Sequence, residues 1–208
     1  RAAMREILDG VYDLERLTSV DFIVVPFRDL PSVAHTMLSF GFDDGNYLCL
    51  SVEIRREQGE SYKALNGVLN AYEIMYVLGD ERDLVQLRTN FRNDDVYVYR
   101  LRTTPEESRA IFLDALERAN ALAAQPEFYN TLTNNCTTSV LGHINHATGN
   151  RVPYGMSVLL PGYSDRALYD AGLIDRGGPF EEARRAAWVS GAAREVAGRE
   201  DFSLAIRR

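Results

Sequence analysis

The order of the secondary-structure patterns most strongly constrains how this chain can fold. The first half alternates apolar and polar residues in short runs, as strands do, and the second half repeats apolar residues at helical spacing. Strands followed by helices predict an α+β fold, with helices packed on an antiparallel sheet. The predicted strands are 21–27, 33–42, 47–55, 71–78, 83–89 and 96–101, and the predicted helices are 2–10, 105–124, 136–149, 164–171 and 181–196, followed by a polar tail.

Composition sets the class of protein. The chain has 208 residues, of which 46% are hydrophobic and 25% charged, and this predicts one globular domain over residues 1–208. The net charge of −7 disfavours a nucleic acid partner. The chain holds no run of apolar residues long enough to span a membrane. Because it begins with Arg1 rather than methionine, we expect a processed or trimmed piece, with targeting or membrane segments outside it.

The strands at 33–42 and 47–55 predict a hairpin. The loop Asp43-Asp44-Gly45, with glycine in the left-handed region, pairs Phe42 with Asn46. Counting outward from that pair sets His35 directly opposite Glu53, so both side chains point to one face of the sheet. We expect the helix that carries Cys136 to pack on this face. The predicted core face holds Leu38, Phe40, Phe42, Leu48, Leu50, Val52 and Ile54, and the His35 face holds Met37, Ser39, Cys49, Ser51, Glu53 and Arg55.

The run Asn134-Asn135-Cys136-Thr137-Thr138 predicts a thiol in the first turn of a helix. The free N–H groups and partial positive charge of a helix start favour thiolate, which lowers a thiol pKa. Such placement suits a nucleophile, although a lone cysteine is also commonly a small buried apolar residue. Cys49, in the middle of a strand, is predicted to be inert. A Cys49–Cys136 disulfide in an oxidising compartment is the other reading.

A nucleophilic thiol needs a base within hydrogen-bonding reach. Of the three histidines, His143 lies about 10 Å and His146 about 15 Å along the same helix from Cys136, so neither reaches it. Elimination leaves His35, and Glu53 could hold its imidazole in the useful tautomer. A surface ion pair between His35 and Glu53 is the alternative.

Other polar groups allow further interpretations. His143 and His146 could share a metal, but two polar residues on a solvated helix face are favoured. Arg55, with Arg56, Glu57 and Glu60, is either a recognition patch for phosphate or carboxylate or an exposed strand end. Residues 80–83 predict a structural turn. Residues 128–130 could line a pocket, but core packing is favoured. No phosphate-binding or dinucleotide-binding motif is present, so we expect no cofactor.

Several segments in order resemble the Lnb N-terminal periplasmic domain family. They are His35–Phe42, Ser51–Glu57 with Gly59-Glu60, Gly79–Leu84 and Phe128–Thr138. The resemblance covers about residues 20–175 and leaves a helical extension over 176–208. It implies a papain-like fold of permuted NlpC type, with Cys136 as nucleophile, His35 as base and Glu53 as third residue. Named members of the family act in lipoprotein N-acylation through a cysteine thioester, in the bacterial cell envelope. Their additional membrane segments lie outside this sequence.

These observations together predict acyl transfer through a thioester on Cys136, acting on a lipid-bearing or peptide-bearing substrate. Backbone N–H groups at the start of the Cys136 helix would hold the oxyanion. Arg55, Tyr129 and Asn135 are candidate substrate contacts. The alternatives are a thiol hydrolase of peptide or peptidoglycan amides, a metal-dependent hydrolase at His143 and His146, and a non-catalytic binding domain.

Overall fold

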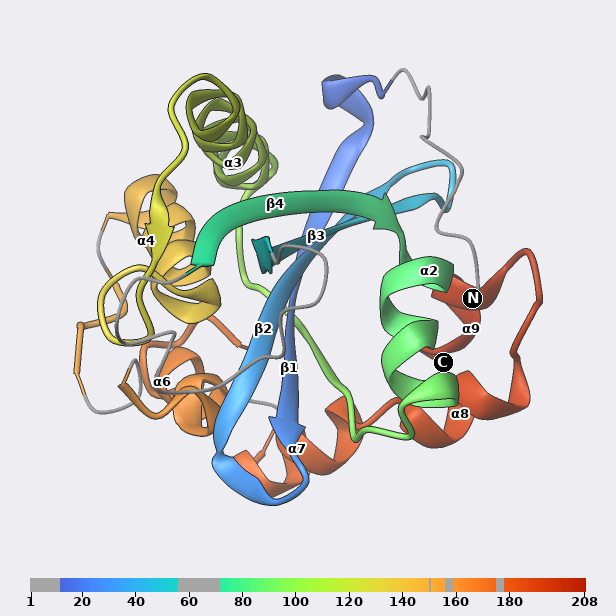
Figure 1. Ribbon diagram of the computed structural model, residues 1–208. Helices are drawn as coiled ribbons and strands as arrows, with labels where there is room; N and C mark the ends of the chain where they lie inside the picture. Colours follow the sequence, from blue (N-terminus) through green and yellow to red (C-terminus); the bar gives the residue numbers. More distant parts are fainter. Residues whose placement is uncertain (1–11, 56–71, 150, 156–158, 175–177) are drawn as a thin grey trace.

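The computed structural model describes residues 12–55, 72–149, 151–155, 159–174 and 178–208. Six antiparallel strands form one sheet in the order β5-β1-β2-β3-β4-β6. In Figure 1, α3, α4 and α6 lie on one side of this sheet and α2, α8 and α9 on the other. The fold is therefore α+β, as predicted. The strands are β1 (Leu17–Phe27), β2 (Leu30–Phe42), β3 (Tyr47–Arg55), β4 (Tyr72–Asp80), β5 (Tyr97–Arg100) and β6 (Phe128–Tyr129).

The hairpin of β2 and β3 has the predicted register. Gly45 takes a φ of 84°, and the Phe42 N–H donates to the Asn46 carbonyl at 2.9 Å. The paired residues run from Gly41 opposite Tyr47 to Met37 opposite Ser51. Beyond this last pair the strands separate: β2 continues along β1, whereas β3 continues along β4. The sheet therefore opens between the first half of β2 and the end of β3.

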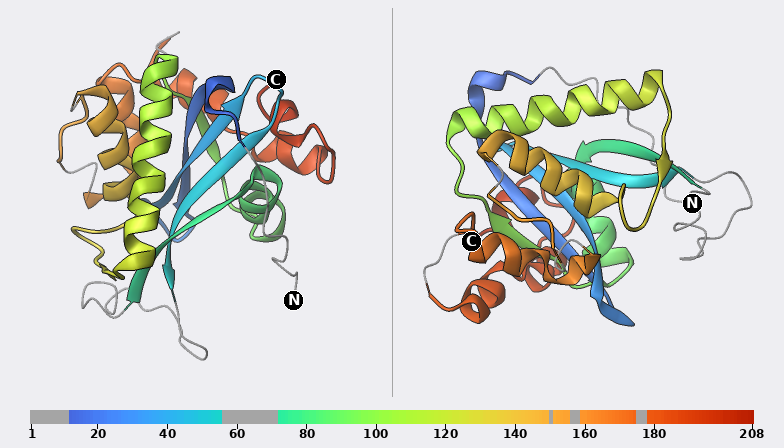
Figure 2. Two further views of the ribbon diagram at one scale, coloured as in Figure 1. Left: turned by 90° about the horizontal axis from the view of Figure 1, so that it is seen from above. Right: turned by 90° about the vertical axis from the view of Figure 1, so that its left-hand side faces the viewer.

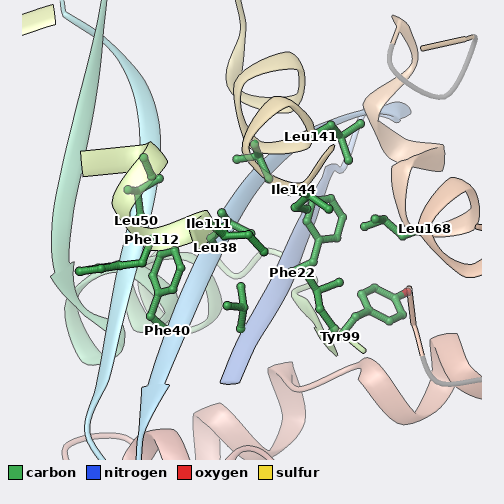
Figure 3. Close-up of a cluster of buried hydrophobic side chains, with 14 of the residues drawn as sticks. Phe22, Leu38, Phe40, Leu50, Tyr99, Ile111, Phe112, Leu141, Ile144 and Leu168 are labelled. Carbon is green, nitrogen blue, oxygen red and sulfur yellow. The ribbon is translucent and has the colours of Figure 1, made fainter. Parts of the chain in front are cut away.

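The main core lies between the sheet and two helices, α3 (Pro105–Ala124) and α4 (Cys136–Thr148), both within a residue of their predicted bounds. Thr104 and Glu107 form a reciprocal capping box at the start of α3. Gly149 ends α4 in the left-handed conformation that glycine adopts without strain. Figure 3 shows side chains from both layers in this core, namely Phe22, Leu38, Phe40, Leu50, Ile111, Phe112, Leu141 and Ile144.

The predicted docking face of α4 is wrong. Val140, Leu141 and Ile144 of this helix share a core with Leu38 and Leu50, on the face opposite the one expected. The other face is filled by a second apolar cluster, to which Met37 and Cys49 of the sheet belong. Three helices cover that cluster: α2 (Glu81–Gln86), α8 (Ser190–Glu195) and α9 (Phe202–Ala205). Figure 2 shows α3 and α4 together on one side of the sheet.

The predicted strand at 83–89 is also wrong, because this segment is helical. Asp80 caps α2 by accepting the Arg82 N–H at 2.8 Å, and a π-helical segment, η2 (Leu87–Phe91), follows. Leu84 and Val85 are buried against the sheet, and a short apolar run of this kind fits either a strand or a helix. The predicted structural use of residues 80–83 is confirmed.

The carboxyl-terminal third contains shorter helices than predicted. The helix expected over 181–196 is two, α7 (Phe180–Ala187) and α8, because the Val189 N–H between them donates to the Val96 carbonyl. The expected polar tail forms α9, whose Phe202 is buried. The remaining elements are η1 (Leu14–Arg16), η3 (Pro161–Tyr163) and α6 (Ser164–Asp170). The predicted helix at 2–10 lies outside the described residues. No helix in the described ranges has the length and hydropathy to cross a bilayer.

Candidate active site

Cys136 is the first residue of α4, and Asn135 fixes its position. The Asn135 side-chain oxygen accepts the N–H groups of Thr137 and Thr138 at 2.8 and 2.9 Å. Its side-chain nitrogen donates to the Thr131 carbonyl at 2.7 Å. This cap joins the helix start to the preceding loop, so the backbone that carries the thiol is held on both sides.

The Cys136 sulfur lies against the edge of β2 that β3 has left. It is 4.0 Å from the Ala34 carbonyl oxygen, and the Thr36 backbone N–H points to it as a donor. The Thr36 and Thr137 hydroxyl groups hydrogen-bond at 3.2 Å beside it. In an antiparallel strand these two backbone groups would face a partner strand. The thiol therefore occupies the opening in the sheet, and in this way a helix on one face reaches His35 on the other.

His35 is buried and joined to Glu53 in two ways. Its Nε2 lies 2.7 Å from Ser51 Oγ and 3.2 Å from Glu53 Oε1. The Ser51 hydroxyl in turn donates to Glu53 Oε1 at 2.7 Å. Ser51 forms the last β2–β3 pair, with Met37, and His35 and Glu53 each lie two residues further along their strand. All three side chains therefore project onto one face, with Ser51 and Glu53 beside the imidazole. The structure thus brings the predicted His35 and Glu53 together, with a serine between them.

Arg88 completes the cluster from the π-helical segment η2. Its side chain is buried, with 7% of the residue exposed, and its Nη2 donates to Glu53 Oε1 at 3.2 Å. Sequence reasoning missed both Ser51 and Arg88 as site residues. Ser51 could have been found from its position two residues before Glu53 on the same face. Arg88 could not, because its segment was predicted to be a strand.

The electrostatics of the cluster favour the thiolate form of Cys136 and the imidazolium form of His35. Burial alone would lower the pKa of His35, but its interactions with Cys136 and Glu53 outweigh burial and raise that pKa to about 9. Burial would raise the pKa of Cys136, but the His35 ring and the Thr36 N–H lower it to about 7. The Glu53 carboxyl is desolvated, yet His35 and Arg88 hold its pKa at about 2. Thiolate and imidazolium therefore coexist between about pH 7 and pH 9.

A cavity of about 370 Å³ opens over the thiol. Of the three residues predicted to contact substrate, Tyr129 and Asn135 line this cavity and Arg55 does not. The Arg55 side chain is 69% exposed and pairs with Glu73 at 3.3 Å. The favoured prediction that residues 128–130 pack in the core is wrong for Phe128, which is 60% exposed. Arg56, Glu57 and Glu60 lie outside the described residues. The other lining residues are Phe27, Val33, Ala34, His35, Val52, Glu53, Ile54, Arg88, Arg92, Thr131, Cys136, Leu159 and Pro161.

The two cysteines are separate. Both thiols are free and buried, and they belong to the two different apolar clusters on opposite faces of the sheet, so the predicted alternative of a disulfide is wrong. Burial raises the pKa of the Cys49 thiol well above its usual value. Cys49 is therefore a protonated core residue, in contrast to Cys136.

His143 and His146 meet at one carboxylate. His143 Nδ1 lies 2.5 Å and His146 Nδ1 2.6 Å from the two oxygens of Asp114, and His143 Nε2 lies 2.8 Å from the Tyr76 hydroxyl. His143 is buried, so the favoured interpretation of a solvated face is wrong for it. Both of its ring nitrogens are occupied. Among the described residues, no group of three or more histidine, cysteine, aspartate or glutamate side chains is arranged to hold a metal ion.

Comparison with known proteins agrees with the resemblance seen in the sequence. No curated protein and no solved structure gives a match. A family model described as the Lnb N-terminal periplasmic domain matches residues 4–162, which is more than half of the chain and includes His35, Glu53 and Cys136. The chain therefore belongs to the Lnb N-terminal periplasmic domain family, and its location is the periplasm.

Proposed function

We propose that this domain is a cysteine acyltransferase or hydrolase that carries an acyl group as a thioester on Cys136. The observation that supports this most is the position of Cys136 Sγ on the β2 edge beside His35, whose ring contacts Ser51 and Glu53. This arrangement lowers the pKa of the thiol to about 7 and raises the pKa of the imidazole to about 9. A nucleophile with a lowered pKa, a neighbouring base and a third polar group behind it are the parts that covalent catalysis requires. The histidine strand precedes the cysteine helix, as expected for a permuted papain-like fold.

The chemistry follows from the order of contacts. His35 Nε2 is engaged by Ser51 and Glu53, which leaves Nδ1 for the thiol. The Cys136 thiolate attacks a carbonyl carbon and forms a carbon–sulfur bond, and the carbonyl oxygen takes up the electron pair. The imidazolium then gives its proton to the leaving amine or alkoxide as the tetrahedral carbon collapses to a thioester. An incoming amine or water next loses a proton to His35 and releases the acyl group.

The oxyanion requires a donor close to Cys136. Two of the N–H groups at the start of α4, those of Thr137 and Thr138, are already taken by Asn135. The Cys136 N–H, at the first position of the helix, is the remaining donor of this turn. The sequence predicts that several backbone N–H groups at the start of this helix stabilise the oxyanion. We now assign that role to the Cys136 N–H.

The cavity walls favour an acyl chain over a peptide. Seven of the lining residues are aliphatic, aromatic or proline side chains without a polar atom: Phe27, Val33, Ala34, Val52, Ile54, Leu159 and Pro161. Apolar walls with a few convergent polar groups suit a ligand whose main part is hydrocarbon. A lipid-bearing acyl donor, and an amine acceptor as in lipoprotein N-acylation, therefore fit better than a peptidoglycan stem. Release to water instead of an amine would make the same site a hydrolase.

Mass spectrometry of the intact protein isolated from cells tests the proposal. We expect an acyl adduct that maps to Cys136, disappears in Cys136→Ala and persists in Cys49→Ala, the matched variant of the other buried thiol. Treatment with neutral hydroxylamine should remove the adduct, because a thioester is cleaved by it. A protein that carries no adduct and turns over no ester, amide or thioester would instead be a non-catalytic binding domain.

A further inference from the structure

Two arginines line the cavity, Arg88 within η2 and Arg92 directly after its end. Arg88 and Arg92 are four residues apart and both contribute to the walls above Cys136. Like charges at this spacing repel each other, and the positive charge of Arg92 acts, after burial, to lower the pKa of Arg88. A helix would avoid this repulsion if the two side chains pointed apart. Both nevertheless line one cavity, and an anion bound there would offset the repulsion between their charges.

Among the described residues, the carboxylate that pairs with either of these two arginines is that of Glu53, which lies 3.2 Å from Arg88. Counting only partners that the structure describes, the Arg88 side chain makes one hydrogen bond, to Glu53, although a guanidinium carries five N–H donors. Glu53 is shared with His35 and Ser51, so a single carboxylate serves two cations. Within the described ranges, the Arg92 side chain has neither a hydrogen bond nor an ion pair, and it is exposed at the cavity.

The charge count of the cavity gives the same result. Apart from the phenol Tyr129, which adds no charge to this sum, its described ionisable lining residues are His35, Glu53, Arg88, Arg92 and Cys136. With thiolate and imidazolium, or with both neutral, they sum to one positive charge. Asp94 acts on Arg88 through its charge but does not line the cavity. A ligand with one negative charge would balance the site.

We propose that Arg88 and Arg92 form an anion subsite beside Cys136, which binds a carboxylate or phosphate group carried by the acyl substrate. The inference rests on the proposed function and adds the chemistry of the substrate's polar part. The apolar walls at Phe27, Val33 and Leu159 take the hydrocarbon part. The substrate class is thus an anionic amphiphile rather than a neutral ester or amide.

Alkylation of Cys136 by two reagents of equal size tests the subsite. Iodoacetate is an anion and iodoacetamide is neutral, and in both cases the sulfur–carbon bond forms as iodide leaves. The measured quantity is the rate with iodoacetate divided by the rate with iodoacetamide, compared with the same ratio for a free thiol. This ratio reports the local charge, and any change in the fraction of thiolate cancels in it. We expect Arg92→Gln to lower this ratio about fivefold. Arg199→Gln, which removes an equal charge from an exposed pair with Asp201, should leave it unchanged. Added salt should lower the wild-type ratio toward that of Arg92→Gln.

The outcomes separate the two proposals. If Cys136 reacts rapidly with both reagents but the ratio is the same in Arg92→Gln and wild type, the anion subsite is wrong and the proposed function stands. If Cys136 reacts with neither reagent faster than an ordinary thiol, the proposed function fails and the subsite with it.

Whether the substrate's anionic group is a phosphate or a carboxylate is tested by asking which anion slows the alkylation of Cys136. Inorganic phosphate and hexanoate are added separately while Cys136 is alkylated by iodoacetamide. Slowing by phosphate alone assigns a phosphate-bearing substrate, and slowing by hexanoate alone assigns a carboxylate. Protection that persists in Arg92→Gln, or protection by neither anion, contradicts the subsite.

Discussion

The Ser51 hydroxyl lies 2.7 Å from His35 Nε2 and donates to Glu53 Oε1 at the same distance. The imidazole is thus held by a short relay and by its direct 3.2 Å approach to the carboxylate. A buried hydrogen bond to a charged group contributes about 1.5–3 kcal/mol. Ser51 therefore positions His35 and supports its charged form, although no substrate would touch it.

Ser51→Ala should lower the pKa of His35 and slow acyl transfer by about tenfold, because the imidazolium loses one of its acceptors. The measurement is the pH profile of kcat/KM, which reports the pKa values of the free enzyme, and its upper limb near pH 9 should move to lower pH. Ser39→Ala is the matched control: Ser39 is buried on the same face but donates to Glu81, away from His35. An upper limb that is unchanged in Ser51→Ala, or moved equally in Ser39→Ala, would show that Ser51 has no such role.

His143 is expected to act in stability rather than in catalysis. It joins Asp114 of α3 and Tyr76 of β4 to α4. His143→Leu leaves both partners without this hydrogen bond and should reduce the free energy of unfolding by about 1–3 kcal/mol. Urea denaturation measures this loss, and the alkylation rate of Cys136 should stay as in wild type. A metal-dependent hydrolase centred on His143 would instead lose zinc and activity together in this variant.

The carboxyl terminus is anchored by a buried ion cluster. Arg207 lies 2.8 Å from Asp21 and 2.5 Å from Glu81, whose carboxylates are both buried. Arg207→Met removes the main cation beside Glu81 and should cost about 3–5 kcal/mol in the free energy of unfolding. Arg199→Gln breaks an exposed pair and should cost less than about 1 kcal/mol. Equal losses in the two variants would contradict the anchoring role of Arg207.

The part of the site that could be predicted is the part that local rules determine. A three-residue loop with Gly45 fixes the register of β2 and β3 up to the Met37–Ser51 pair, and alternation two residues further along each strand puts His35 and Glu53 on one face, 3.2 Å apart. Capping residues likewise mark the start of α4, and with it the position of Cys136.

The wrong predictions have a different cause: they depend on tertiary contacts between segments far apart in the sequence. The separation of β2 from β3 after Met37 leaves no mark in the alternation of either strand, so the route by which Cys136 reaches His35 could not be foreseen. The break between α7 and α8 depends on the Val96 carbonyl, about ninety residues away in the chain. Leu84 and Val85 would be buried in a strand or in a helix, and the cap at Asp80 decides between them.

The most direct measurement is the pH dependence of Cys136 alkylation by iodoacetamide, in wild type and in His35→Gln. A thiolate stabilised by imidazolium predicts a rate that rises with an apparent pKa of about 7 in wild type. Removing the imidazole leaves burial unopposed, so the apparent pKa in His35→Gln should rise to about 9 or above. An apparent pKa near 9 in both proteins would contradict the Cys136–His35 pair.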